Sequence, residues 1–157
     1  MAQTDALTGL PNRRGWEQRL SALLSAARRS QRPLVVALAD LDRFKSYNDR
    51  GGHQAGDDLL RTFALNGLAA IREGDTIARW GGEEFAIALP DCGAGHAVFV
   101  LDRIRHATPG DQTCSIGYAT WDGMEDPGRL MSRVDQALYL AKRQGRDRLV
   151  AASSRMS

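Results

Sequence analysis

A continuous apolar run, residues 34–39 (Leu-Val-Val-Ala-Leu-Ala), constrains the fold of this chain more than any other feature. A strand with one solvated face alternates apolar and polar residues, whereas an uninterrupted apolar strand is covered on both faces. Segments with helical periodicity precede and follow this run, so helices are available to cover both faces. The run therefore predicts a buried strand in a sheet that is sandwiched between helices.

Further periodic segments complete one domain of the α+β class, an α/β sandwich with helices on the faces of one sheet. Apolar residues at three-to-four spacing predict helices over residues 12–30, 56–71, 94–106 and 130–143, with Leu68 and Val98 among the inward-facing side chains. Asn12 is a candidate N-cap and Gly145 a candidate C-terminal cap. Strand-like runs lie at 76–79, 84–89, 112–120 and 148–152. We expect a loop from the end of the first strand to residue 56, and a frayed polar tail over 153–157.

The composition is that of a soluble globular domain of 157 residues. A net charge of +2 is too small to indicate a nucleic-acid partner. No apolar run is long enough to span a membrane, and the N-terminus lacks the pattern of a signal peptide. Cys92 and Cys114 have neither metal-ligand spacing nor a disulfide framework, which favours the reduced cytoplasm. A motif-like segment begins almost at the first residue, so we expect residues 1–157 to be a single domain cut from a longer signalling protein.

The segment Trp80-Gly81-Gly82-Glu83-Glu84-Phe85 places two glycines and two carboxylates between two strand-like runs. A Gly-Gly pair in that position predicts a hairpin turn, because both central residues of a tight turn can need positive φ. Side chains alternate along a strand, so Glu83 and Glu84 are expected to point to opposite sides. Taken alone, the segment is most simply a solvated hairpin tip.

Two other segments change that interpretation. Asp40-Leu41-Asp42 places carboxylates at the end of the buried strand, where a turn can hold Mg²⁺ and phosphate oxygens together. Residues 48–57 combine an amide, carboxylates, an imidazole and glycines with little apolar content, and Asn48 with an aspartate suits a guanine edge. Asp57 also has an ordinary interpretation as a helix N-cap. Together with the acidic hairpin, these segments indicate metal-dependent nucleotidyl or phosphoryl transfer.

These residues resemble the diguanylate cyclases, or GGDEF domains, over nearly the whole chain. The resemblance rests on motifs in a fixed order: Asp5-Ala6-Leu7-Thr8-Gly9-Leu10-Pro11-Asn12-Arg13-Arg14; Asp40-x-Asp42-x-Phe44-Lys45-x-x-Asn48-Asp49-x-x-Gly52-His53-x-x-Gly56-Asp57; Gly81-Gly82-Glu83-Glu84-Phe85; Ser115-Ile116-Gly117-Tyr118-Ala119; and Asp135-x-Ala137-Leu138-Tyr139-x-Ala141-Lys142-x-x-Gly145-Arg146. It implies the palm-like fold of nucleotidyl cyclases and polymerases, with a central, mostly antiparallel sheet. The implied reaction converts two GTP into cyclic di-GMP and two pyrophosphates, in a homodimer with one GTP per subunit.

The resemblance also implies roles for individual residues. Asp40, the carbonyl of Leu41 and Glu83 would bind Mg²⁺, for which Mn²⁺ is a possible substitute. Asn48 and Asp57 would read guanine, and His53 would line the nucleotide pocket. The amides near Phe44 and Lys45, with the side chains of Lys142 and Arg146, would hold phosphates, and Lys45 would also offset charge in the transition state. Glu83 or Glu84 would help deprotonate the attacking ribose 3′-OH, and which of the two does so stays open here.

A second, inhibitory site is implied upstream of the hairpin. Arg72-Glu73-Gly74-Asp75 has the register of the family's RxxD motif, and Arg79 lies between that motif and the glycines. Arg72, Asp75 and Arg79 would bind the product cyclic di-GMP, since guanidinium groups suit phosphates and guanine acceptors while a carboxylate suits guanine donors. This predicts feedback inhibition. The ordinary interpretation is a helix-end loop with surface ion pairs.

The chain departs from the family's pattern in two places. The connection through Pro109-Gly110-Asp111 is shorter than usual, and Asp147 stands where the family usually has Asn. Two alternative functions also stay open. One is a non-enzymatic module that binds GTP or cyclic di-GMP, against which the intact hairpin argues. The other is a cyclase that uses a different nucleotide, although Asn48 with Asp57 favours guanine over adenine.

Overall fold

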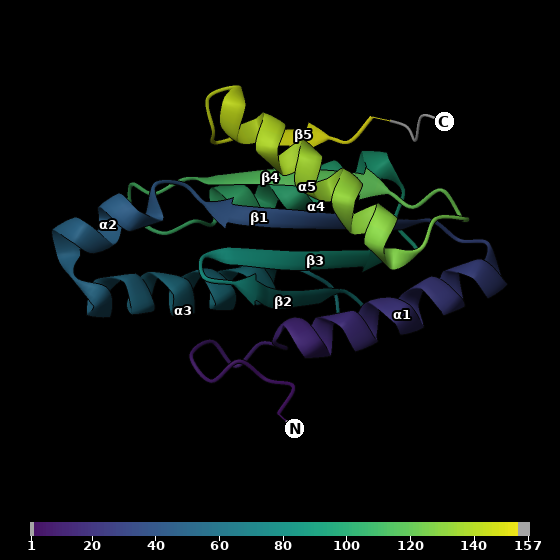
Figure 1. Cartoon of the computed structure of the whole chain (residues 1–157), viewed down its shortest axis with the longest axis horizontal. Helices are drawn as coiled ribbons and strands as arrows, with labels where there is room; N and C mark the ends of the chain where they lie inside the picture. The colour runs from purple at the N-terminus through teal and green to yellow at the C-terminus, as the bar shows by residue number, and fades with distance from the viewer. Residues whose placement is uncertain (1, 154–157) are drawn as a thin grey trace.

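The computed structural model describes residues 2–153, which form one sheet covered by helices on both faces (Figure 1). The sheet has the strand order β2-β3-β1-β4-β5. Its strands are β1 (Leu34–Leu41), β2 (Thr76–Gly81), β3 (Glu84–Pro90), β4 (Cys114–Thr120) and β5 (Leu149–Ala151). All neighbours are antiparallel except β4 and β5, which are parallel. The expected α+β class with a mostly antiparallel sheet is confirmed.

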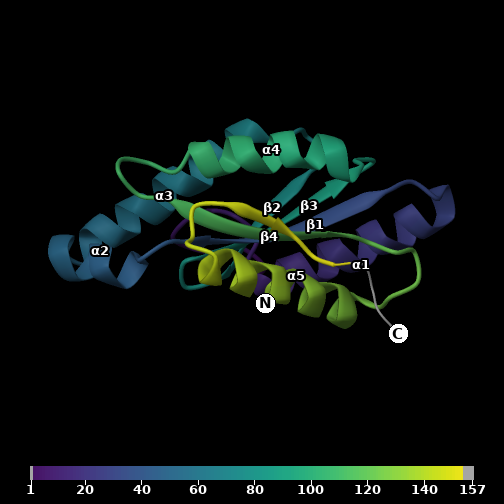
Figure 2. The same cartoon turned by 90° about the horizontal axis from the view of Figure 1, so that it is seen from above.

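The apolar run is the central strand, as its pattern predicts, and every residue of β1 is buried. Helices α3 (His53–Ala70) and α4 (Ala94–His106) lie on one side of the sheet, and α1 (Arg13–Ser30) and α5 (Pro127–Arg143) lie on the other (Figure 2). Val35, Ala37 and Ala39 belong to the core on the α3–α4 side. Leu34, Val36 and Leu38 belong to the core on the α1–α5 side. Alternation along the strand thus gives each helical layer its own hydrophobic core.

Local capping explains where the helices of the α1–α5 layer begin. The side chain of Asn12 accepts a hydrogen bond from the N–H of Gly15, 3.0 Å away, which confirms it as the N-cap of α1. Asp126 caps α5 in the same way by accepting from the N–H of Arg129. Gly145, with φ +119°, follows the end of α5 in a conformation that glycine adopts readily.

The expected loop before residue 56 is wrong, because residues 44–51 form a helix, α2 (Phe44–Gly51), and α3 begins at His53. None of the residues of α2 is fully buried, so the segment lacks the apolar stripe by which periodicity reveals a helix. Phe44 and Tyr47 do pack, partly buried, against the core. Gly52, with φ +88°, separates the two helices and allows the change of direction between them.

Two residues expected in the core are exposed. Leu68 is 48% exposed and Val98 is 36% exposed. The buried face of α3 passes instead through small residues, among them Gly67, where an added Cβ would lie only 2.7 Å from Cδ1 of Ile77. A helix that approaches the sheet through glycine presents its neighbouring leucine to solvent, which a pattern of large apolar residues does not reveal.

Within residues 2–153, no helix has the length and apolar character needed to cross a membrane. The expected frayed tail over 153–157 lies outside the described residues except for Ser153.

Candidate active site

Asp40 and Glu84 face each other where the central strand ends. They are cross-strand partners on β1 and β3, and Asp40 is 5% exposed. Nζ of Lys142, from the last turn of α5, lies 2.5 Å from Oδ2 of Asp40. The three residues come from elements far apart in the chain, and the antiparallel register brings their charges together.

The electrostatics of this cluster favour an additional cation. Burial, followed by the charge of Asp40, raises the pKa of Glu84 to about 7. Burial also raises the pKa of Asp40, although Lys142 opposes the shift. Burial acts to lower the pKa of Lys142, but the hydrogen bond and charge of Asp40 outweigh it and raise that pKa. Two carboxylates that share one lysine retain a deficit of positive charge, which suits a metal ion or a proton.

The hairpin turn differs in detail from the expected one. Gly81 pairs with Glu84, so the two central residues are Gly82 and Glu83, and of the two glycines only Gly82 has positive φ, at +34°. Because Glu83 lies in the turn, strand alternation does not direct its side chain away from the site. Its charge contributes to raising the pKa of Asp40. The expectation that the side chains of Glu83 and Glu84 point to opposite sides stays a prediction. The carbonyl of Glu83 also accepts from the N–H of Leu41, at 3.2 Å.

These oxygens fit a hard cation. The predicted donor set consists of two carboxylates, Asp40 and Glu83, with the Leu41 carbonyl at the strand end, and hard cations such as Mg²⁺ prefer oxygen ligands. Among the described residues, no three His, Cys, Asp or Glu side chains form a ready-made metal site. A cation held here would therefore complete its coordination with water or substrate oxygens, as is usual for Mg²⁺.

Asn48 lies against α3 with an unsatisfied acceptor. Its Oδ1 is buried and accepts no hydrogen bond from the described residues. A Cβ added at Gly56 would lie 1.7 Å from that atom, so the glycine provides the space for the amide. Asp57 is half-buried next to Gly56, while His53 is exposed at the start of α3. A buried acceptor without a donor is unfavourable unless a ligand supplies one.

The predicted phosphate contacts lie at the start of α2 and after α5. Lys45 is exposed in the first turn of α2, and no side chain caps the N–H groups of that turn. Phe44 beside it is half-buried. Arg146 is half-buried, and its guanidinium makes no hydrogen bond or ion pair to any described residue. Free helix N–H groups and free cations are the groups that bind anions.

Asp42 has a structural role that the sequence did not reveal. It accepts from Oγ1 of Thr113 at 2.7 Å, Oγ of Ser115 at 2.6 Å and the N–H of Asp147 at 3.1 Å. It is 5% exposed, so these three donors replace the water that a carboxylate loses on burial. The donors lie just before β4, on β4 and after α5, and no local sequence pattern links them.

The structure brings two of the three predicted inhibitory-site residues together. Arg72 donates from Nη2 to Oδ1 of Asp75 at 3.3 Å and to the carbonyl of Pro90 at 2.8 Å. Arg79 has other partners: Nε and Nη2 donate to the carbonyl of Gly82 at 3.0 and 2.8 Å, and Nη1 forms an ion pair with Asp5. Arg79 therefore ties the N-terminal segment to the hairpin turn.

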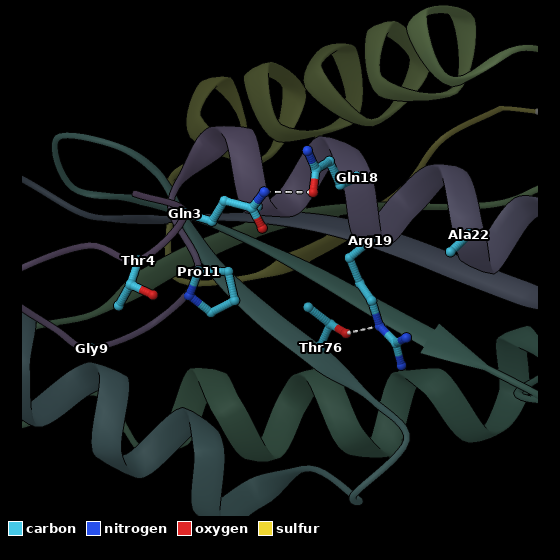
Figure 3. A pocket seen from close by; sticks show the side chains of 9 residues that line it. Gln3, Thr4, Gly9, Pro11, Gln18, Arg19, Ala22 and Thr76 are labelled. Atoms are coloured by element: carbon cyan, nitrogen blue, oxygen red, sulfur yellow. Dashed lines mark hydrogen bonds between the residues drawn. The ribbon is translucent and has the colours of Figure 1, made fainter. Parts of the chain in front are cut away.

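A separate pocket lies between the N-terminal segment, α1 and β2 (Figure 3). It has a volume of about 580 Å³, and none of the predicted site residues lines it. Gln3 donates to Gln18 at one end, and Arg19 donates to Oγ1 of Thr76 at the other. Its lining offers one cation and two side-chain amides, without the carboxylates of the site at the end of β1.

Known proteins resemble this chain in sequence and in structure. The family model described as diguanylate cyclase, GGDEF domain, matches residues 2–148. The diguanylate cyclase DgcP of Pseudomonas aeruginosa is 41% identical over 96% of this chain, and the response regulator PleD of Caulobacter vibrioides is 36% identical over 98%. The chain spans only 24% and 37% of the lengths of these two relatives.

Solved structures agree. The GGDEF domain of DgcB from Caulobacter crescentus, in complex with c-di-GMP, superposes with a TM-score of 0.92 at 34% identity, covering 98% of this chain and 95% of that one. The active GGEEF domain of a diguanylate cyclase from Vibrio cholerae superposes with a TM-score of 0.85 at 32% identity, covering 94% and 99%. The palm-like cyclase fold that the resemblance implied is thereby confirmed. With its hairpin, strand-end carboxylates and fold, this chain belongs to the GGDEF family of diguanylate cyclase domains.

Proposed function

We propose that this chain is a diguanylate cyclase that condenses two GTP molecules into cyclic di-GMP and releases two pyrophosphates. The observation that carries the proposal is the buried pair Asp40 and Glu84, opposed across β1 and β3 beside an intact GGEEF hairpin. Each subunit holds one GTP, so two copies must present their sites to each other. The reaction thus requires a homodimer.

Asp40, Glu83 and the carbonyl of Leu41 are the proposed ligands of Mg²⁺, with Mn²⁺ as a substitute. A cation bound there supplies charge neutralisation at the triphosphate and lowers the pKa of a coordinated hydroxyl. Lys142 is already paired with Asp40 at the site. We propose that its ammonium group turns to the β and γ phosphates when nucleotide binds, together with Arg146 and the first amides of α2.

Glu84 is the better candidate for the general base. Its pKa of about 7 is close to neutral pH, where a base both accepts a proton readily and is substantially ionised. In this proposal Glu84 accepts the proton of the ribose 3′-OH that attacks the α-phosphate of the facing GTP. Lys45, exposed at the start of α2, offsets the negative charge that develops on the phosphate.

The guanine edge is assigned to Asn48 and Asp57, with His53 at the rim of the pocket. The buried, unpaired Oδ1 of Asn48 supports this assignment, because N1–H and N2–H of guanine are donors. Adenine presents an acceptor at N1 and no 2-amino group. Recognition of GTP rather than ATP follows from that difference.

Arg72 and Asp75 are proposed to bind the product and inhibit the enzyme, as the RxxD register implies. Their ion pair holds Arg72 at the protein surface, where its side chain is 52% exposed. Arg79 would join them only after releasing Asp5 and the carbonyl of Gly82. Calorimetry with cyclic di-GMP tests this: Arg72→Ala should abolish product binding and product inhibition, and unchanged inhibition would contradict the assignment.

Incubation of the purified chain with Mg²⁺ and either GTP or ATP, followed by mass spectrometry, tests the proposed activity. We expect cyclic di-GMP from GTP only, none after chelation of the metal, and none from the near-isosteric variant Glu84→Gln. The assay is run at high protein concentration and again with a fused dimerisation helix, since a monomer binds only one of the two GTP molecules that react. A dimerised wild-type protein that makes no cyclic dinucleotide would refute the proposal.

A further inference from the structure

The turn that follows α5 is backbone-strained at two non-glycine residues. Gly145, Arg146 and Asp147 have φ values of +119°, +65° and +48° in succession. Left-handed backbone is unfavourable for an ordinary L-residue, because its Cβ crowds the following carbonyl oxygen. Arg146 and Asp147 keep this conformation only if surrounding contacts hold it.

Contacts from two distant elements hold the turn. The N–H of Asp147 donates to Asp42, at the end of β1. From α4, Nη1 of Arg105 donates to the carbonyl of Asp147 at 3.2 Å and to its Oδ1 at 2.5 Å. Arg105 is itself anchored, because its Nε donates to Oδ1 of Asp102 at 2.9 Å and its side chain is only 17% exposed.

We propose that Arg105, acting through Asp147, is a positioning residue for Arg146 and thereby for the β and γ phosphates of GTP. This inference rests on the proposed function, which assigns Arg146 to those phosphates. The guanidinium of Arg146 has no partner of its own among the described residues, so the backbone of the turn determines the direction in which its side chain leaves the chain. Arg105 fixes that backbone from α4, while Asp42 fixes it from the residue next to Leu41.

A positioning role of Arg105 and a merely stabilising role predict different effects on ligand affinity. A phosphate-positioning role concerns only ligands that carry β and γ phosphates. GMP offers the same guanine and ribose without those groups. A loss confined to the triphosphate therefore identifies positioning, whereas general loosening of the domain weakens both ligands.

The experiment compares two ligands on the full chain by calorimetry in Mg²⁺ buffer. One is a GTP analogue in which a methylene group replaces the oxygen between the α and β phosphorus atoms, which prevents turnover, and the other is GMP. Charge-assisted hydrogen bonds to a phosphate are worth enough that their misplacement should weaken binding about tenfold. For Arg105→Ala we expect that loss for the analogue and less than about twofold for GMP. Arg105→Lys, which keeps the charge and one donor group, should recover part of the affinity.

A double-mutant cycle tests whether Arg105 affects nucleotide binding through Arg146. If Arg105 acts through Arg146, then adding Arg105→Ala to Arg146→Ala should change the affinity for the analogue by less than about twofold. Arg32→Ala, which breaks an exposed ion pair with Asp91, is the matched control and should leave both affinities unchanged. Thermal unfolding of each variant checks that the domain is folded.

Several results would overturn the inference. The first is an equal loss of affinity for the analogue and for GMP in Arg105→Ala. The second is full additivity of the losses of Arg105→Ala and Arg146→Ala in binding free energy for the analogue. The third is wild-type affinity of Arg105→Ala for the analogue. An active wild type in which Arg146→Ala leaves analogue binding unchanged would also overturn it, while leaving the cyclase proposal intact. A wild type that neither binds the analogue nor makes cyclic di-GMP would overturn both.

Discussion

Gly56→Ala should impair GTP recognition without unfolding the protein. An alanine Cβ at this position would lie 1.7 Å from Oδ1 of Asn48, whereas ordinary contacts begin near 3.4 Å. Cγ and Nδ2 of the same amide would lie 2.7 and 3.2 Å from the new Cβ, so the whole amide must move, its oxygen by about 1.7 Å, away from where guanine donors would meet it. The oxygen belongs to a short side chain that can rotate, and replacing glycine by alanine within α3 favours the helix by about 1 kcal/mol. The free energy of unfolding should thus stay within about 1 kcal/mol of the wild-type value.

The effect on the ligand is larger. A buried acceptor left unsatisfied costs about 1–3 kcal/mol, and a guanine donor that pairs with it recovers much of that energy. A loss of about 2 kcal/mol corresponds to roughly 30-fold weaker binding of GTP. ITP lacks the 2-amino group of guanine, so the wild type should prefer GTP and the variant should lose most of that preference.

Calorimetry with the non-reacting analogues of GTP and ITP measures both quantities, and urea unfolding reports stability. Gly95→Ala is the matched control, because it also lies in a helix but its added Cβ meets open space. We expect it to leave both affinities unchanged. Wild-type affinity and preference in Gly56→Ala would refute the assignment of Asn48 to guanine.

Three further predictions concern the hairpin, the sheet and the charge cluster. In Gly117→Ala, the new Cβ would meet backbone atoms of α5, 2.1 Å from the nitrogen of Leu138. Urea unfolding should therefore show that the free energy of unfolding falls by about 3 kcal/mol. A decrease below about 1 kcal/mol would contradict the close packing of α5 on β4. Arg79→Ala removes the hydrogen bonds to the Gly82 carbonyl and the ion pair with Asp5. Because the turn then loosens, kcat should fall about tenfold. An unchanged kcat would mean that the strands alone hold the turn. Glu84 has a folded-state pKa of about 7 against 4.5 when unfolded, so its contribution to stability in metal-free protein is fully present below pH 4.5 and is lost as the pH rises through about 7. After allowance for partial exposure this amounts to about 1–2 kcal/mol, and Glu84→Gln should flatten the pH dependence of urea unfolding between pH 5 and 8; an unaltered slope would refute the raised pKa.

The sequence predicted the sheet and its long helices well, because those elements carry uniform patterns. The run at 34–39 has no polar residue, and it is the buried central strand. Helix α2 was missed because none of its residues is fully buried and its stability depends on the placement of Phe44 and Tyr47 against the core. Leu68 was misplaced because α3 approaches the sheet through Gly67, whose contribution to packing is the absence of a side chain.

The site shows the same division. The types and spacing of Asp40, Asn48 and Glu83 suffice to suggest metal and nucleotide binding, whereas Lys142 was identified only through the resemblance to the GGDEF family. The pairing of Asp40 with Glu84, and the pKa of about 7 that follows, require the antiparallel register of β1 and β3. The unpaired oxygen of Asn48 exists only because α2 and α3 pack through Gly56.

By itself, the sequence determined the class of fold and the kinds of groups at the site, because local patterns of residues indicate both. Only the tertiary structure decided which groups act together. Asp42, Arg105 and Asp147 come from separate segments, and no periodicity or motif connects them. Burial and distance set the energies of charges and hydrogen bonds, and both quantities arise only when the sheet brings distant segments into contact.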